Sequence, residues 1–295
     1  MAPECCPPKC ESADFRRIID TPAVSCDNSG SFGLHVLTCR RDFYFAFWCL
    51  KSLWYFSDIQ PRLVVHDDGT LTEAQLELFG EHFRGCRVVL RSESDELVGA
   101  TLSDYHHARR YRFDDHHPLS LKLFDINIIA KEEYEEYIVV LDSDVVFFSE
   151  PRELLGNISR KTTCVMADVG HGLAVHPPRL AEFAPDLTRS RVNTGIMAIY
   201  PAVLDLARID RFLGNLFRCK PEHVDRALIE QTCYALLFSG HQEEYRFLSR
   251  AYHLPFWGVG NWTQACHYFG ETKPLFQFQG IQRLVRGSFG SRLGS

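Results

Sequence analysis

The sequence has no apolar run long enough to cross a lipid bilayer. Its longest fully apolar run near the start, FYFAFWCL at residues 43–50, is far shorter than the roughly 20 residues of a membrane-spanning helix. The first residues, MAPECCPPKCESADFRR, also lack the apolar middle section of a signal peptide. From these absences we expect a cytoplasmic protein without a transmembrane segment.

Long runs of one charge are missing as well. The net charge is -6 at pH 7 over 295 residues, and no long basic run occurs, so we expect no nucleic-acid partner. The hydrophobic content of 45% is ample for a large core. No internal repeat and no convincing linker divides the chain, which predicts a single domain over residues 31–295.

The cysteines do not form the pattern of a disulfide framework. There are 11, an odd number, and most lie inside apolar segments such as TCVMADV and EQTCYALLF. This pattern favours buried free thiols in a reducing compartment. Cys5, Cys6 and Cys10 lie near the start without a second ligand pair at zinc-like spacing. We therefore predict a poorly ordered Cys/Pro-rich extension over residues 1–30, with metal binding as the alternative.

A regular alternation of strands and helices is predicted from about residue 32. Residues 33–39 form an expected strand, residues 41–56 a helix, and a second strand ends near His66. The next helix begins after Thr72, an N-cap with Gln75 as its capping-box partner. A third strand is expected at 86–92. This alternation predicts a Rossmann-like α/β fold, with a mostly parallel sheet flanked by helices on both faces.

The second half is predicted less regularly. Residues 94–118 are polar, with two pairs of histidines, and are typical of a functional loop. Further elements are expected as a helix at 119–134, strands at 137–142, 163–169 and 194–200, and helices at 202–217 and 223–238.

Asp142 and Asp144 interrupt the apolar segment YIVVLDSDVVFF at the expected end of a strand. Ligands of open α/β sheets bind at the carboxyl ends of the strands, and paired carboxylates there can hold Mg²⁺ or Mn²⁺. On these two residues alone, the pattern is explained equally well without a metal, if one aspartate caps the following turn and the other faces solvent.

A second group of polar residues lies in CHYFGETKP, near the end of the chain. His267 could complete a metal site, and an imidazole beside carboxylates favours Mn²⁺ over Mg²⁺. Gly270 would allow the backbone to approach a phosphate, and Lys273 would offer it a charge. A surface turn with a solvated lysine is the alternative.

Two further polar positions interrupt apolar segments. Asn193 precedes an expected strand in RVNTGIMAIYP, where it suits either a polyhydroxylated ligand or a plain turn. Glu230 and Gln231 lie in an otherwise apolar helix, either on its solvent-exposed edge or directed into a site.

In their order along the chain, these segments resemble the retaining nucleotide-sugar glycosyltransferases of family eight, which include glycogenin and bacterial galactosyltransferases. The resemblance covers about residues 33–279 and is strongest in four segments: SLKLFDI…IVVLDSDVVFFSEPRELL, VNTGIMAIYP, EQTCYALLF and HYFGETKP. It implies a GT-A fold and the transfer of a hexose from a UDP-sugar to an acceptor hydroxyl.

The resemblance also implies roles for individual residues. Asp142, Asp144 and His267 match ligands of Mn²⁺, with Mg²⁺ as the alternative. Glu230-Gln231 matches an Asp-Gln pair beside the anomeric carbon, which implies that Gln231 and Glu230 are the catalytic residues. The implied donor-binding residues are Thr38, Tyr44, Lys122, Asp142, Ser143, Asp168, Asn193, Gly270 and Lys273. The chain departs from the family where Leu275 replaces a common Trp and Ser120 a common donor-binding Arg.

Two other functions are compatible with parts of the pattern. VVLDSDVV also looks like the opening motif of haloacid-dehalogenase-like phosphatases, but no Gly-Asp dipeptide follows to complete their magnesium site. A non-catalytic sugar-nucleotide-binding protein is the second alternative. The acceptor is unassigned: a sugar, a lipid-linked sugar or a protein. Residues 94–118 and the aromatic stretch near Phe256, Trp257 and Trp262 could shape its groove, although core packing would explain these aromatics about as well.

Overall fold

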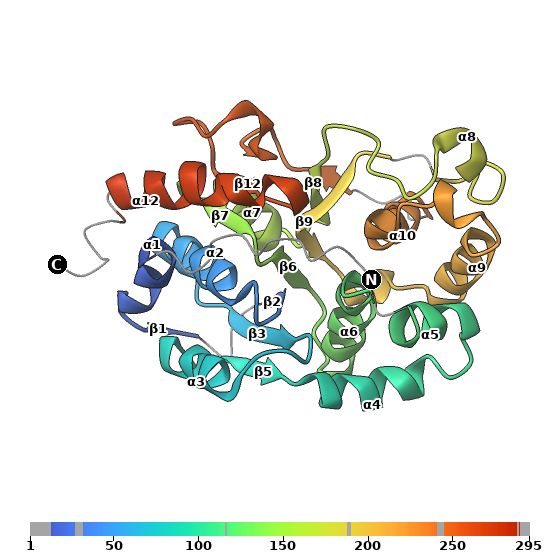
Figure 1. Cartoon of the computed structure of the whole chain (residues 1–295), viewed down its shortest axis with the longest axis horizontal. Coiled ribbons are helices and arrows are strands. Elements are labelled where there is room, and N and C mark those ends of the chain that lie inside the picture. Colours follow the sequence, from blue (N-terminus) through green and yellow to red (C-terminus); the bar gives the residue numbers. More distant parts are fainter. Residues whose placement is uncertain are drawn as a thin grey trace.

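A seven-stranded sheet forms the centre of the computed structural model, which describes residues 13–26, 32–115, 117–187, 190–240, 245–287 and 289 (Figure 1). The strand order is β10-β8-β9-β6-β2-β3-β5. Strand β9 is antiparallel to its neighbours β6 and β8, and the other pairs are parallel. The predicted mostly parallel α/β sheet is therefore confirmed. Its strands are β2 (Gly33–Thr38), β3 (Arg62–Asp67), β5 (Arg87–Val89), β6 (Ile138–Asp142), β8 (Cys164–Ala167), β9 (Val192–Ile199) and β10 (Arg246–Phe247).

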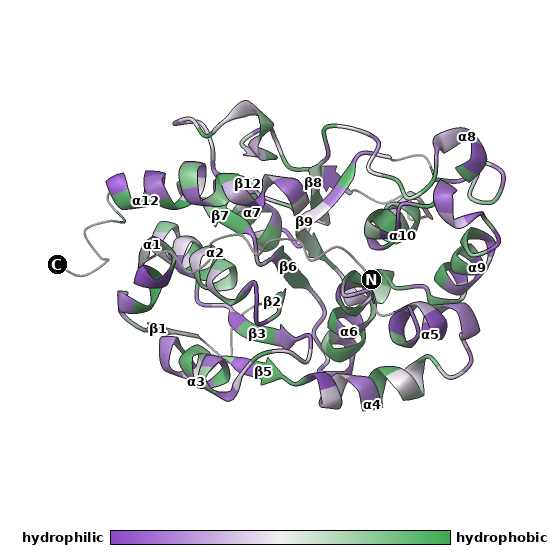
Figure 2. Ribbon diagram, in the orientation of Figure 1, coloured by the Kyte–Doolittle hydropathy of each residue, from purple (hydrophilic) through white to green (hydrophobic). Residues whose placement is uncertain are grey.

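Strand β6 faces two hydrophobic cores because successive side chains of a strand point to opposite faces. Val139 and Leu141 belong to one core, and Ile138 and Val140 to the other. Both faces of the strand are therefore buried, which explains why residues 138–141 are all apolar rather than alternating with polar ones (Figure 2).

Helices cover both faces of the sheet, as predicted. The core around Val139 includes side chains of α2 and of the C-terminal α12, and the core around Val140 includes those of α6, α9 and α10. These helices are α2 (Phe43–Phe56), α6 (Leu119–Glu132), α9 (Leu206–Leu216), α10 (Ile229–Gly240) and α12 (Gln282–Arg286).

Part of the segment that was expected to lack order packs onto the first core. Residues Ala13–Arg16 form α1, Arg17–Asp20 a 3-10 turn, and Val24–Ser25 strand β1, which pairs with β4 (Phe83–Arg84). Ile18 is fully buried, and Trp48 donates a hydrogen bond to the carbonyl of Phe15 at 3.0 Å. The folded chain therefore begins before the expected boundary at residue 30. Cys5, Cys6 and Cys10 lie outside the described residues.

The polar segment at 94–118, predicted as a loop, is mostly helical. Helix α4 covers Arg91–Thr101, where the end of a strand was expected, and α5 covers His106–Phe113. One of its arginines is buried: Arg112 forms a buried ion pair with Asp125 at 2.6 Å and also lies 2.7 Å from the more exposed Asp95. Its charge is neutralised inside the fold, so a basic composition here does not indicate a solvated loop.

A small sheet joins distant parts of the sequence beside the main sheet. Its order is β11 (Tyr252–His253), β12 (Ala265–His267) and β7 (Val145–Phe147). Strand β12 runs antiparallel to β7, with His267 opposite Val145. This pairing places the end of β12 next to the Asp142–Asp144 segment.

The remaining helices are short or lie at the periphery. Helix α3 has the capping box predicted from Thr72 and Gln75. The helices are α3 (Glu73–His82), α7 (Arg152–Ser159), α8 (Pro177–Leu180) and α11 (Lys273–Leu275), followed by a π-helical turn at Phe276–Ile281.

Eight cysteines in the described part of the chain are free thiols. Within the same residues, no helix is long and apolar enough to span a membrane.

Candidate functional site

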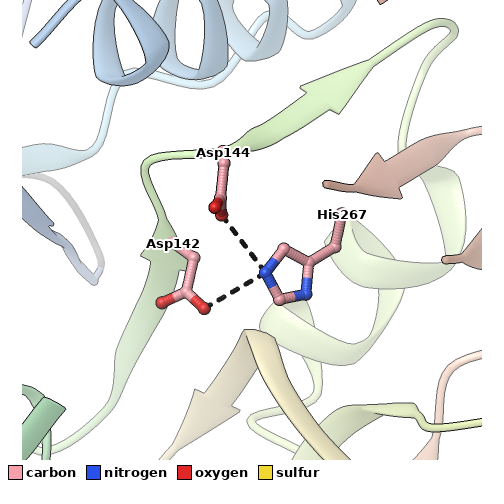
Figure 3. A group of neighbouring side chains, drawn as sticks. All are labelled: Asp142, Asp144 and His267. Carbon is pink, nitrogen blue, oxygen red and sulfur yellow. Dashed lines mark ion pairs between the residues drawn. The ribbon is translucent and has the colours of Figure 1, made fainter. Parts of the chain in front are cut away.

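Asp142, Asp144 and His267 come together at the carboxyl end of β6 (Figure 3). One potential ligand atom from each lies within 4.8 Å of the others. The Nε2 of His267 is 3.4 Å from Oδ2 of Asp142 and 3.2 Å from Oδ1 of Asp144. Within the described ranges this is the one such group of three His, Cys, Asp or Glu side chains. Two carboxylates and an imidazole suit Mn²⁺ or Mg²⁺, so the donor set fits the metal that the sequence implied.

Residues of β9 orient the His267 ring through its Nδ1. Its Nδ1 lies 2.9 Å from Oδ1 of Asn193, which also accepts a hydrogen bond from the backbone N–H of Gly195. An amide oxygen only accepts, so Nδ1 carries the proton and Nε2 is free to act as a ligand. Gly195 makes room for the ring, because a Cβ there would lie 2.2 Å from Nδ1 of His267.

Lys273 links the Asp142–Asp144–His267 cluster to the start of α2. Its Nζ lies 3.3 Å from Oδ2 of Asp144 and 2.7 Å from Oδ2 of Asp42. Burial alone would raise the pKa of Asp144, but the positive charge of Lys273 is the largest of the opposing causes, and the pKa is held down to about 2. Asp144 is therefore ionised at neutral pH. Asp42 was not predicted, because nothing in its local sequence connects it to a lysine so far along the chain.

Lys122 is a buried cation on the opposite side of Asp142. Its Nζ lies 2.5 Å from Oδ1 of Asp142, 3.0 Å from Oγ1 of Thr194 and 3.6 Å from Oε1 of Glu230. Burial lowers the pKa of Lys122, but Asp142 and Glu230 outweigh burial and raise it above its ordinary value. The lysine is thus held charged by the carboxylates around it.

Glu230 is buried next to this lysine, with 1% of its surface exposed. Its Oε2 accepts a hydrogen bond from Thr194 at 3.0 Å. Burial raises the pKa of the Glu230 carboxyl, Lys122 lowers it and Asp142 raises it again, and the result is a pKa of about 7. Thr194 was missed from the sequence, although it belongs to the VNTG segment.

Gln231, Asp168 and Asn193 form a polar group next to the metal cluster. The Nε2 of Gln231 donates to the carbonyl of Gly172 at 2.8 Å and lies 3.5 Å from Oδ2 of Asp168. Asn193 Nδ2 donates to the same Asp168 oxygen at 3.3 Å. Gly172 has φ +53, and a Cβ there would lie 2.4 Å from Nε2 of Gln231.

The other predicted site residues lie around this group with fewer contacts. Thr38 ends β2, and its buried Oγ1 has no hydrogen-bond partner among the described residues. Ser143 lies between the two aspartates and is 7% exposed. Gly270 has φ +48, in the left-handed region. The ring of Tyr44 packs against that of Phe43, with centroids 5.1 Å apart, and among the described residues it makes no polar contact with Asp142, Asp144 or His267.

No family model and no curated protein matches the sequence, but solved structures match the fold. The WbbM bifunctional glycosyltransferase superposes with a TM-score of 0.55 and 12% identity over 92% of this chain, which spans 52% of the length of WbbM. Mouse xyloside xylosyltransferase 1 gives a TM-score of 0.50 and 14% identity over 84% of this chain and 98% of its own. Galactosyltransferase LgtC, solved with donor and acceptor sugar analogs, gives a TM-score of 0.52 and 13% identity over 89% of this chain and 95% of its own. The chain therefore has the GT-A glycosyltransferase fold.

Proposed function

We propose that the chain is a metal-dependent retaining glycosyltransferase of family eight that transfers a hexose from a UDP-sugar to an acceptor hydroxyl. The observation that carries this proposal is the Asp142–Asp144–His267 cluster at the carboxyl edge of the sheet. Two lysines lie against its carboxylates, Lys122 and Lys273. A cation site flanked by fixed positive charges suits a diphosphate, and the order of the four sequence segments supports the same assignment.

The three ligands would hold Mn²⁺, with Mg²⁺ as the alternative. The bound ion would neutralise charge on the donor diphosphate as UDP departs. Lys273 would neutralise part of the same charge. Its Nζ lies beside Asp144 and Asp42, so a β-phosphate bound at the cluster would be a further anionic partner for it. Such electrostatic contributions amount to about 3 kcal/mol each. Gly270, in its left-handed conformation, would let the backbone approach the diphosphate.

The polar group beside the cluster would bind the transferred sugar. Asp168 and Asn193 would form hydrogen bonds with its hydroxyls. Gln231 uses an N–H to bind the Gly172 carbonyl, which leaves its amide oxygen to stabilise an oxocarbenium-like anomeric carbon. Glu230 faces Lys122 from a buried position, and we propose that it supports the reaction centre through that lysine.

The uridine would lie at the neighbouring ends of β2 and α2. The unpartnered hydroxyl of Thr38 supports this placement, because a buried polar group usually has a hydrogen-bond partner. Ser143 and Tyr44 complete the proposed donor contacts. The acceptor would be a hydroxyl of a sugar, a lipid-linked sugar or a protein.

Release of UDP from a panel of UDP-sugars, in Mn²⁺ and in EDTA, tests this function. We expect Mn²⁺-dependent release from at least one donor, and a loss of about 10²-fold or more in Asp144→Ala. Asp58→Ala, which changes an exposed aspartate, is the matched control and keeps full activity. UDP release that survives in Asp144→Ala contradicts the proposal. Hydrolysis of p-nitrophenyl phosphate instead would favour the phosphatase, and Mn²⁺-dependent UDP binding without release would favour a binding protein.

A further inference from the structure

Four aromatic side chains near the end of the chain are exposed. The exposed fractions are 55% for Phe256, 58% for Trp257, 50% for Trp262 and 36% for Phe269. We call these four residues the aromatic platform. Their exposure excludes core packing, which the sequence had left open as the explanation of the first three. Exposed aromatic side chains grouped in one segment indicate a surface that binds a ligand, another protein or a membrane.

Two residues of the aromatic platform, Phe256 and Phe269, connect to the proposed metal site through ring contacts. The ring of Phe269 lies 5.6 Å from the ring of His267, and the ring of Phe256 lies 6.2 Å from that of Phe269. Two ring contacts therefore connect His267, a proposed metal ligand, to the exposed Phe256. A molecule bound at Phe256 would therefore lie beside Phe269, whose ring contacts a residue of the cluster.

The two tryptophans of the platform share one buried support. Their rings lie 6.1 Å (Trp257) and 4.7 Å (Trp262) from the ring of His253. His253 is 1% exposed, and its ring nitrogens lie 2.7 Å from the carbonyl of Leu254 and 3.1 Å from Oγ1 of Thr263. Both imidazole nitrogens are thus engaged, which fixes the ring against which the tryptophans pack.

The loop that carries the platform is also braced by helix α12. Arg283 donates hydrogen bonds to the carbonyl of Val259 at 3.1 Å and to Oδ1 of Asn261 at 2.9 Å. The N–H of Gly260 donates to Oγ1 of Thr263 at 3.0 Å. The apolar rings are therefore held in an exposed position by polar bonds beneath them, and a ligand that binds there has little ordering entropy to overcome.

We propose that the aromatic platform binds the acceptor, and that the acceptor is a saccharide whose pyranose rings stack on Phe256 and the adjacent tryptophans. This inference rests on the proposed function, because it takes the Asp142–Asp144–His267 cluster as the donor side. The C–H face of a pyranose is apolar and matches an aromatic face, while its hydroxyls stay in water or reach the cluster. The platform's path to His267 favours a substrate of this site over a separate protein or lipid partner.

Saturation-transfer NMR with the full chain tests the inference directly. The probes are the neutral methyl glycosides of glucose, galactose, xylose and mannose, and disaccharides of these sugars, each measured with diamagnetic Mg²⁺ plus UDP and again in EDTA. We expect at least one probe to receive saturation at its ring C–H protons. Phe256→Ala should weaken its binding roughly tenfold. Phe256→Tyr, which keeps the aromatic face, should restore it.

Phe247→Ala is the matched control, because Phe247 is 37% exposed and lies on β10 of the main sheet, outside the segment that carries the platform. It should bind the probe like the wild type. Equal affinity in Phe256→Ala and wild type overturns the inference, as does binding of no probe. Phe256-dependent sedimentation with phosphatidylcholine vesicles, without saccharide binding, also overturns it in favour of a lipid surface. Saccharide binding without Mn²⁺-dependent UDP binding would contradict the donor assignment alone, whereas the reverse result would contradict the platform alone.

Discussion

The Oδ1 of Asn193 lies 2.9 Å from Nδ1 of His267, and this contact determines which imidazole nitrogen faces the two aspartates. A hydrogen-bond acceptor behind a ligating histidine fixes its tautomer and ring orientation. In Asn193→Ala that acceptor is lost, so we expect Mn²⁺ affinity to fall by about 10- to 100-fold. Titration of Mn²⁺ by electron paramagnetic resonance measures the change. Unchanged affinity would show that the ring is positioned by packing alone.

Gly195 tests the same geometry by steric means. A Cβ at this position would lie 2.2 Å from Nδ1 of His267, so Gly195→Ala must displace the ring or the strand. We expect Mn²⁺ affinity to fall by at least roughly tenfold, the lower end of the effect of disturbing a ligand's support. Gly80→Ala is the matched control, since a Cβ there meets nothing within 4 Å. Retention of wild-type affinity in Gly195→Ala would contradict the role of His267.

Glu230 should make metal-free stability depend on pH. Burial is the main cause that raises its pKa, to about 7 from 4.5. The folded chain therefore keeps a proton that the unfolded chain releases. This contribution to the free energy of unfolding is fully present below pH 4.5 and is lost as pH rises to about 7. The shift corresponds to roughly 3 kcal/mol.

Urea unfolding in EDTA at a series of pH values measures this effect. In Glu230→Gln the loss between pH 4.5 and 7 should disappear, so the variant gains stability relative to wild type as pH rises. Glu271→Gln, at an exposed glutamate, is the control and should follow the wild-type curve. Parallel curves for Glu230→Gln and wild type would show that Glu230 does not titrate in this range.

Lys273 should affect transfer more than binding. Its Nζ pairs with Asp42 and Asp144 and would stabilise charge that develops on the leaving diphosphate. We expect Lys273→Ala to lower the rate of transfer by roughly 10²- to 10³-fold, while uridine binds nearly as in wild type. Comparison of kcat with the dissociation constant of uridine measures both. A loss confined to uridine binding would contradict this assignment, and Lys220→Ala, at an exposed lysine, serves as the control.

Local patterns were enough to predict the elements that carry the site. The apolar strand before Asp142 and the capping box at Thr72 are both encoded within a few residues. The residues alone suggested that His267 could complete a metal site, but left a surface turn as the alternative, and only the resemblance assigned it to Asp142 and Asp144. The reason is that the β12–β7 pairing that brings them together joins segments more than a hundred residues apart.

Contacts between distant charged residues were not predictable. Asp42 meets Lys273 across 231 positions, and neither neighbourhood indicates the other. Arg112 misled the prediction in the opposite direction: its local sequence is basic, yet its side chain is buried against Asp125 and helps to hold α5 in place. Charge patterns identify solvated segments only when the partners of the charges are also local.

Calorimetric titration of UDP into the wild-type chain, with Mn²⁺ and with EDTA, tests the central claim most directly. If the Asp142–Asp144–His267 cluster holds the ion that binds the donor diphosphate, UDP binds in Mn²⁺ and loses most of its affinity in EDTA. Asp144→Ala should then bind UDP equally weakly in both buffers. UDP binding of equal strength with and without the metal, or no binding in either buffer, would contradict the claim.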